Sequence, residues 1–278
     1  MHDHPIRAAI FDIDGTLALM DKEKGRFAAL PGAVEALAAC RDAGIAVIAY
    51  TNGTFFPPAH YYPLLAEAGI VIDKGHILTP AAVAAQALAR QGYTRIMVMG
   101  GDGTRVPIAE AGIEIVDPSP DAGHVDAILL GYTRDFGATE LEAVVQAVWD
   151  GAEPFAGSVA PYFASSKGRM LGISGAIAAA LENATNRKVT VFGKPETAGL
   201  DIASAITGAK PQEMAVIGDD PKLEIRMGRR AGAFTVGVTT GITDRALFES
   251  FPEDERAHVV LPGLTDFAAQ PWFPKMPA

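Results

Sequence analysis

Short apolar runs alternate with helical stretches along most of the chain. Runs rich in Val, Ile and Leu are typical of buried strands, and apolar residues spaced three or four positions apart predict helices. Their alternation predicts an α/β fold with a parallel sheet. We predict strands at residues 7–11, 45–50, 95–99, 113–116, 125–130, 189–192, 214–217, 234–238 and 258–261. Predicted helices lie at residues 32–43, 58–68, 80–91, 138–149, 174–183 and 197–206, and another ends near Gly232.

Local signals mark several helix ends. Gly44 is placed to end the helix that starts at Gly32, and Thr79 is placed as an N-cap before Pro80 at the first helical position. From Thr79 the alternation of strands and helices starts afresh. The middle of the chain therefore predicts a small α/β domain of its own.

Composition narrows the class of protein. The 278 residues are 49% hydrophobic, enough for a substantial core, and the net charge of -10 disfavours general affinity for nucleic acid or an anionic membrane. No apolar stretch has the length of a membrane span, and the first residues lack the apolar core of a signal sequence, so we expect a soluble, cytoplasmic protein. Cys40 is the only cysteine, which excludes an intrachain disulfide, and its helical pattern predicts core packing.

Polar residues of complementary chemistry follow four of the predicted strands. Carboxyl ends of parallel strands meet at one edge of a sheet, where open α/β folds bind ligands. Closely spaced carboxylates favour a hard cation such as Mg²⁺ between them, and a lysine and a hydroxyl nearby suit phosphoryl transfer. Taken alone, Lys194, Thr51 and the pair Asp219 and Asp220 are more typical of the surface, a turn or a helix cap. The Asp-x-Asp-Gly pattern of Asp12 and Asp14 fits a solvated turn and a metal site equally well. The residues are Asp12 and Asp14, Thr51 and Asn52, Lys194, and Asp219 with Asp220.

The sequences FDIDGTL, TNG, GKP and IGDD, in this order, resemble the haloacid dehalogenase superfamily, in particular its subfamily IIA, the NagD-like and p-nitrophenyl phosphatase group. The resemblance runs from Ala8 to about Gly241. It implies a Rossmann-like three-layer α/β/α core with a parallel sheet, formed by residues 1–78 and 174–278. It also implies an inserted, smaller α/β cap domain at residues 79–173, which closes over the site.

The resemblance also implies roles for individual residues. Asp12 would be the nucleophile that forms an aspartyl phosphate, and Asp14 the acid and then the base, with its backbone carbonyl on Mg²⁺. Thr51, Asn52 and Gly53 would bind the phosphoryl oxygens. Lys194 would neutralise charge between Asp12 and phosphate. The metal residues would be Asp12, Asp14 and Asp219.

Some positions depart from the family pattern or stay open. Glu224 stands where the family commonly has aspartate, and is interpreted either as an orienting residue near the metal or as an ion-pair partner of Arg226 or Arg229. Residues 156–159 replace the usual Ala-Thr-Asn segment, which leaves substrate specificity open. Candidates for gripping the substrate in the cap, or else solvated loop residues, are Tyr132, Arg134, Lys167 and Arg169. A metal pair of His2 and His4 is a weaker alternative to a loose terminus.

We therefore expect a Mg²⁺-dependent phosphatase that hydrolyses a small phosphorylated metabolite. A phosphomutase would use the same aspartyl phosphate and pass the group to a substrate hydroxyl. A non-enzymatic aspartyl-phosphate switch is the alternative from another class, but such domains are shorter and lack a long insert before the lysine. A dehalogenase would need neither the metal nor the acid at Asp14. The identity of the substrate and the oligomeric state, with a homodimer as one option, stay open.

Overall fold

The structure is a computed structural model that describes residues 4–21, 25–165 and 168–274. By contacts between Cα atoms the chain divides into two units. We call residues 1–51, 60–78 and 194–278 the core unit, and residues 52–59 and 79–193 the cap unit. None of the described helices is both long and apolar enough to span a membrane.

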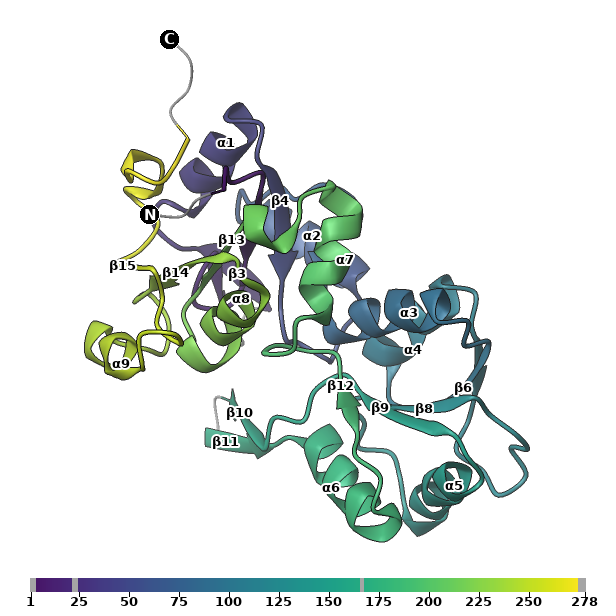
Figure 1. Cartoon of the computed structure of the whole chain (residues 1–278). Coiled ribbons are helices and arrows are strands. Elements are labelled where there is room, and N and C mark those ends of the chain that lie inside the picture. The colour runs from purple at the N-terminus through teal and green to yellow at the C-terminus, as the bar shows by residue number, and fades with distance from the viewer. Residues whose placement is uncertain (1–3, 22–24, 166–167, 275–278) are drawn as a thin grey trace. The chain divides into compact units, whose positions relative to one another are not determined.

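A six-stranded parallel sheet forms the centre of the core unit (Figure 1). Its strand order is β15-β14-β13-β1-β4-β5. Because the strands are short, apolar and buried on both faces, helices have to cover both sides. The strands are β1 (Ala8–Phe11), β4 (Ala46–Tyr50), β5 (Ile77–Leu78), β13 (Met214–Gly218), β14 (Phe234–Val238) and β15 (Val259–Leu261).

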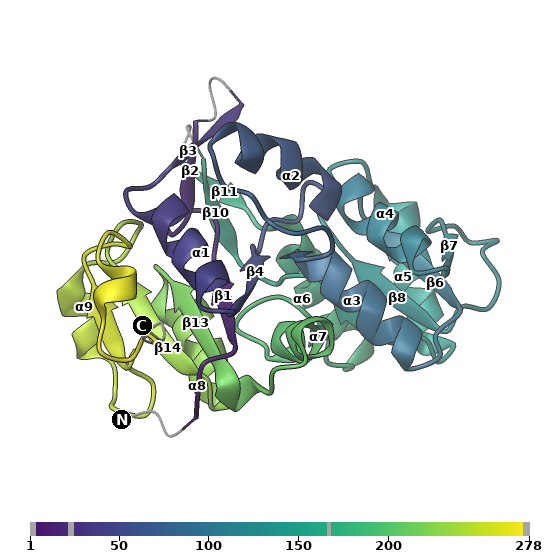
Figure 2. The same ribbon diagram turned by 90° about the horizontal axis from the view of Figure 1, so that it is seen from above.

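Helices lie on both faces of this sheet. The buried residues of α1 (Ala33–Asp42) and α2 (Pro58–Glu67) form one apolar cluster with alternate residues of the strands. On the opposite face α7 (Ala198–Thr207) packs on β4 and α8 (Arg226–Ala231) on β14, and Figure 2 shows α1 and α8 on opposite sides of β1 and β13. The predicted three-layer α/β/α core is thus confirmed. The antiparallel pair β2 (Ala18–Asp21) and β3 (Arg26–Ala29) and the short α9 (Arg245–Ser250) complete the unit.

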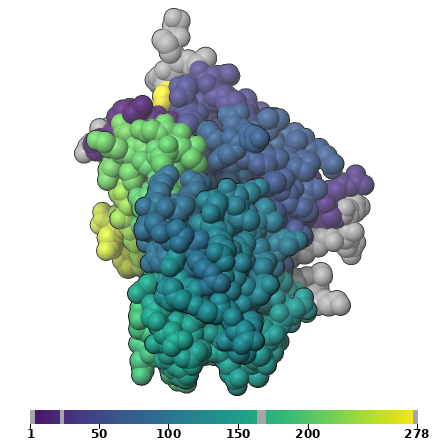
Figure 3. Space-filling view, turned by 90° about the vertical axis from the view of Figure 1, so that its right-hand side faces the viewer, coloured from purple at the N-terminus to yellow at the C-terminus, as the bar shows by residue number. Residues whose placement is uncertain are grey.

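The cap unit is built on a second parallel sheet, of order β12-β9-β8-β6-β7. Its helices α5 and α6 share an apolar cluster with one face of the sheet, and Figure 1 shows α3 and α4 on the other face. The teal atoms of the space-filling view belong to this unit (Figure 3). The strands are β6 (Arg95–Met99), β7 (Glu114–Val116), β8 (Ala127–Leu130), β9 (Glu153–Ala156) and β12 (Thr190–Val191), besides a hairpin of β10 (Tyr162–Ser165) and β11 (Gly168–Leu171). The helices are α3 (Pro80–Arg90), α4 (Asp102–Glu110), α5 (Ala138–Trp149) and α6 (Ile173–Thr185).

Each predicted strand and helix overlaps an observed one. The Thr79 hydroxyl accepts a hydrogen bond from the Ala82 N–H at 3.3 Å, as expected of an N-cap. The elements that the apolar pattern did not predict are short or contain proline. Pro154 lies inside β9, and Pro107 lies inside α4.

The structure places the second domain boundary later than the sequence analysis does. Residues 174–193 were expected in the core, but they belong to the cap unit. The reason is tertiary: α6 packs on β8 and β9, and β12 pairs with β9. Residues 52–59, also expected in the core, likewise group with the cap unit.

Candidate active site

Three of the candidate residues follow neighbouring strands of the core sheet. β1 lies between β13 and β4, and both pairs are parallel, so the carboxyl ends of the three strands share one edge. Asp12 follows β1, Thr51 follows β4 and Asp219 follows β13. All three are buried, with exposed fractions of 7%, 4% and 5%. The structure thus brings together acids and a hydroxyl that lie far apart in the sequence.

Lys194 reaches the same edge from a loop. Its Nζ donates to Asp12 Oδ1 at 2.5 Å and to the backbone carbonyl of Tyr50 at 2.8 Å, directly before Thr51. The side chain of Lys194 is only 1% exposed. The helix that follows it, α7, approaches β4 closely, because a Cβ atom on Gly199 would come within 2.3 Å of the Tyr50 ring. This packing fixes the start of α7, and with it the stretch that carries Lys194.

Glu224 completes the buried cluster. Its Oε1 lies 2.6 Å from Lys194 Nζ, and its Oε2 accepts a hydrogen bond from the Asp220 N–H at 3.1 Å. Glu224 belongs to a π-helical turn at Pro221–Ile225, and its side chain folds over Gly218, where a Cβ atom would come within 2.2 Å of Glu224 Cγ.

The contacts of Glu224 decide whether it pairs with arginine. The proposed pairing with arginine is not what the structure shows. Arg226 pairs with Glu255 at 3.3 Å, and Arg229 donates to the backbone carbonyls of Glu253 and Asp254. Glu224 contacts the lysine instead. Sequence reasoning identified the position but not the partner, because the contact depends on folding.

Burial and mutual repulsion shift the carboxyl groups of this cluster. Burial, joined by the charges of Asp219 and Asp14, raises the pKa of Asp12 to about 6 against the lowering effect of Lys194. Burial and Glu224 raise the pKa of Asp219 to about 6. Burial likewise raises the pKa of Glu224 to about 7.

The lysine responds in the opposite way to its neighbours. Burial by itself lowers the pKa of Lys194, but the charges of Asp12 and Glu224 outweigh it and hold the pKa above its usual value. Lys194 is therefore a permanent cation at neutral pH. One buried cation faces three buried carboxylates, which leaves negative charge in excess when all are ionised.

This excess suits a divalent cation. Among the described residues, no three His, Cys, Asp or Glu side chains are grouped so as to hold a metal ion by themselves. Mg²⁺ is commonly held by one or two carboxylates, with water and substrate oxygens completing its shell. Asp12 and Asp219 supply such carboxylates. The third ligand expected from the sequence is the backbone carbonyl of Asp14, not its carboxylate. The residues present therefore fit Mg²⁺ but not an all-side-chain cage.

Asp14 differs from the other acids because it is exposed. The chain turns directly after it at Gly15, whose φ of 88° lies in the left-handed region that favours glycine. Asp14 is near enough to Asp12 for its charge to raise the pKa of Asp12. Asn52 and Gly53 belong to the cap unit, and their part in binding phosphoryl oxygens stays a prediction.

The candidates for substrate contact in the cap unit are described only in part. The Arg134 Nε donates to the Tyr132 hydroxyl at 2.8 Å, and the Tyr132 ring lies 4.1 Å from that of Phe55. These residues thus form a small aromatic and cationic group. Lys167, the Arg169 side chain and His2 lie outside the described residues.

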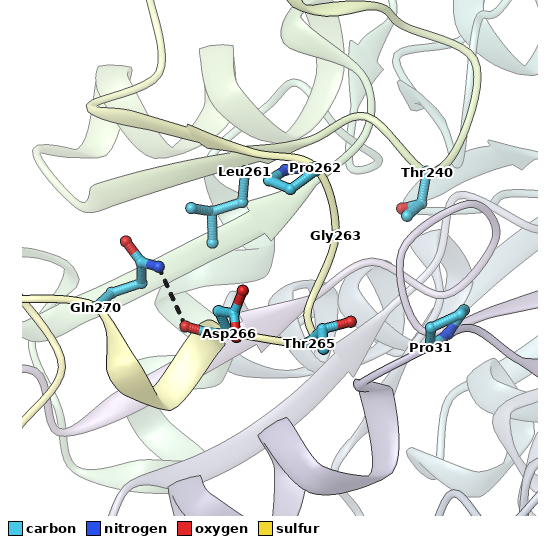
Figure 4. A pocket seen from close by; sticks show the side chains of 8 residues that line it. All are labelled: Pro31, Thr240, Leu261, Pro262, Gly263, Thr265, Asp266 and Gln270. Atoms are coloured by element: carbon cyan, nitrogen blue, oxygen red, sulfur yellow. Dashed lines mark hydrogen bonds between the residues drawn. The ribbon is translucent and has the colours of Figure 1, made fainter.

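A separate pocket of about 200 Å³ lies on the core unit (Figure 4). None of the candidate site residues lines it. Its wall includes Thr240, whose hydroxyl donates to the Gly15 carbonyl at 2.6 Å, directly after Asp14. The pocket is lined by Pro31, Thr240, Leu261, Pro262, Gly263, Thr265, Asp266 and Gln270.

Two family models match the chain. One described as haloacid dehalogenase-like hydrolase matches residues 9–114, and one described as HAD-hydrolase-like matches residues 191–267. A curated relative, haloacid dehalogenase-like hydrolase domain-containing protein 2 of Bos taurus, is 32% identical over 237 residues, which are 85% of each chain.

Solved structures share the fold. A p-nitrophenyl phosphatase from Archaeoglobus fulgidus has a TM-score of 0.84 and 25% identity, covering 95% of this chain and 99% of its own. A glycerol phosphate phosphatase from Mycobacterium tuberculosis, solved in complex with magnesium, has a TM-score of 0.80 and 24% identity. The match covers 93% of this chain and 75% of that one.

Proposed function

The chain belongs to the haloacid dehalogenase-like hydrolases and is a phosphatase of that superfamily, and from this premise we propose how its site works. We propose that it hydrolyses phosphate monoesters of small metabolites with the help of Mg²⁺, through an aspartyl phosphate on Asp12. The observation that carries this proposal is the contact of Lys194 with Asp12 and with the carbonyl before Thr51. It supports a nucleophile, a cation and a phosphate-binding hydroxyl at one sheet edge.

In the first step, an oxygen of the Asp12 carboxylate attacks phosphorus. A P–O bond to Asp12 forms, and the P–O bond to the leaving group breaks. The leaving oxygen takes a proton from Asp14, whose exposed side chain is placed to exchange protons with solvent. Lys194 balances the charge that builds up between Asp12 and the phosphoryl oxygens, and the Thr51 hydroxyl donates to one of these oxygens.

In the second step, water attacks the phosphorus of the aspartyl phosphate. Asp14, now ionised, takes a proton from this water, and the P–O bond to Asp12 breaks. Inorganic phosphate leaves, and both acids return to their starting states. Glu224 keeps Lys194 in place throughout, because its Oε1 lies 2.6 Å from the same ammonium group that contacts Asp12.

Asp12, Asp219 and the Asp14 carbonyl would hold the cation. When bound, Mg²⁺ offsets the negative charge of the phosphoryl oxygens and of the clustered carboxylates. The magnesium complex of a glycerol phosphate phosphatase of the same fold supports this choice of metal.

Partners and location follow the sequence-based expectations. The substrate would be a small phosphorylated metabolite, and the net charge of -10 argues against nucleic acid. We further propose that the protein acts in the cytoplasm and that it forms a homodimer through its cap unit. Size-exclusion chromatography with light scattering tests the second of these.

The test is phosphate release from a panel of nucleoside, sugar, glycerol and pyridoxal phosphates, with Mg²⁺ and with a chelator. We expect many phosphates per chain with Mg²⁺ and none with the chelator. At most one phosphate per chain would indicate a switch, and conversion of a substrate into its phosphate isomer would indicate a mutase. Turnover that persists in chelator would contradict the role of the metal.

A further inference from the structure

A loop outside the recognised motifs contacts two parts of the candidate metal site. Residues 240–242, here the 240–242 loop, follow β14 and precede α9. We propose that the 240–242 loop is a positioning element that fixes the Asp219 carboxylate and the Asp14 carbonyl for the metal. This inference rests on the proposed function, because it takes these two groups as ligands.

The loop holds the Asp219 carboxylate by one oxygen. The Ile242 N–H donates to Asp219 Oδ2 at 2.9 Å. A Cβ atom on Gly241 would lie 1.9 Å from this oxygen, and one on Gly15 would lie 2.6 Å from it. The carboxylate is therefore confined between two glycines, and one oxygen is engaged by the loop. Asp219 Oδ1 is the carboxylate oxygen that the Ile242 N–H does not engage.

The loop holds the Asp14 carbonyl through the next residue. Gly15 donates its N–H to the Ala18 carbonyl at 2.9 Å and accepts the Thr240 hydroxyl at its own carbonyl at 2.6 Å. The Gly15 N–H and the Asp14 C=O belong to one planar trans peptide and point in opposite directions. Anchoring Gly15 at both backbone groups therefore fixes the direction of the Asp14 carbonyl.

The side chains of the 240–242 loop are not part of the buried core. Gly241 is exposed, and the Ile242 side chain is 78% exposed, so the loop contributes mainly backbone and one hydroxyl. Thr240 is half-buried at the wall of the pocket in Figure 4. Substitutions in the loop should therefore change the site while the fold persists.

The experiment compares Mg²⁺ binding to substrate-free protein by calorimetry in Thr240→Val, Thr240→Ser and Gly241→Ala. Gly241 is not among the glycines of positive φ, and the three atoms nearest to an added Cβ all belong to Asp219, so alanine there tests the close approach to Asp219. The matched control is Thr239→Val, the same change one residue away, where the hydroxyl contacts the Pro262 carbonyl at 3.5 Å and not Gly15. Circular dichroism and thermal unfolding in chelator report whether each variant folds.

We expect Thr240→Val and Gly241→Ala to bind Mg²⁺ at least about tenfold more weakly, the size found when partners of metal ligands are removed. Thr240→Ser keeps the hydroxyl and should stay within about twofold of the wild type, as should Thr239→Val. Saturating Mg²⁺ should restore kcat in Thr240→Val, which a merely destabilised variant would not show.

Wild-type affinity in folded Thr240→Val and Gly241→Ala would overturn the inference and leave the phosphatase proposal standing. Equal losses in Thr239→Val and Thr240→Val would also overturn it, because the effect would then be general to the loop. A wild-type protein that hydrolyses phosphate esters but binds no Mg²⁺ would remove both the metal and its positioning element. A wild type without hydrolysis that still shows the expected order of Mg²⁺ affinities would contradict only the proposed function.

Discussion

Lys194 Nζ lies 2.5 Å from Asp12 Oδ1, although 182 residues separate the two in the sequence. The whole cap unit is inserted in this interval. A buried ammonium in direct contact with a buried carboxylate is costly to assemble, since both groups lose their hydration. Such a pair is typical of a functional site, because the surrounding fold has to hold the two groups together.

Replacing Asp12 by asparagine should abolish turnover in a folded protein. The amide keeps the shape and still accepts from Lys194, but it is not a nucleophile. We expect kcat for p-nitrophenyl phosphate to fall at least about a thousandfold, as for other nucleophile variants. The unfolding free energy should change by about 1 kcal/mol or less, because a costly buried charge is removed along with its attraction to Lys194.

Asp73→Asn is the matched control, since it makes the same change at an exposed carboxylate. It should leave kcat unchanged. Normal rates in Asp12→Asn would take the role of nucleophile away from Asp12.

The Lys194–Glu224 pair should show strong energetic coupling. Lys194→Met leaves buried carboxylates without their cation and should reduce the unfolding free energy by about 3–5 kcal/mol. Adding Glu224→Gln to Lys194→Met removes one of the uncompensated charges. The double variant should therefore lose less unfolding free energy than the sum of the losses in the two single variants. A coupling energy of about 1–3 kcal/mol from urea unfolding is expected.

The partly exposed pair Arg226–Glu255, at 3.3 Å, provides the comparison. Its coupling energy should stay below about 1 kcal/mol, because solvent screens the charges. Equal coupling in the two pairs would argue against a buried, dry environment at Lys194.

The buried carboxylates predict an unusual pH dependence of stability without metal. The pKa values of Asp12, Asp219 and Glu224 rise from 3.8, 3.8 and 4.5 to about 6, 6 and 7. Between the lower and the higher values the folded protein binds more protons than the unfolded chain. Its unfolding free energy therefore decreases as the pH rises through this interval, as far as these groups contribute.

A bound cation should reverse this trend, because it binds the deprotonated carboxylates. We expect the increase in melting temperature caused by Mg²⁺ to be small at the acid end of the interval and to grow as the pH rises above about 7. The melting temperature in Mg²⁺ minus the melting temperature in chelator isolates the contribution of the metal site, because the other acids affect both temperatures equally. An effect of Mg²⁺ that is constant across this range would contradict the shifted pKa values.

The sequence predicted the parts of the fold that depend on local patterns. The strands β1, β4 and β13 are continuous apolar runs followed by polar residues, so both their type and the shared edge of Asp12, Thr51 and Asp219 followed from pattern and parallel pairing. The assignment of α6 to the cap unit could not be predicted from the sequence, because an alanine-rich amphipathic helix can pack on either sheet. Its partner is decided by β12, which pairs with β9.

The same distinction applies to the site. The residues Asp12 and Lys194 stand in recognisable motifs, but nothing in the sequence near Glu224 indicates that it contacts Lys194 rather than a neighbouring arginine. The contacts of Thr240 and Gly241 were missed for a similar reason. Thr240 and Gly241 act by approaching Gly15 and Asp219 closely in the folded protein. No sequence pattern indicates such a close approach.

Cys40 should report directly on opening of the core unit. It is the only cysteine, it is fully buried in α1, and burial raises the pKa of its thiol to about 12. Because the thiolate is the reactive form, a thiol reagent should not modify the native protein. The Cys40 thiol should react fully in denaturant. In native buffer, its rate of modification should be set by the free energy of opening of the core unit around α1. The Cys40→Ala, Glu35→Cys double variant carries its thiol at an exposed position of the same helix and should react at once. Rapid labelling of Cys40 in the native wild type would mean that α1 detaches from the sheet far more often than its packing allows.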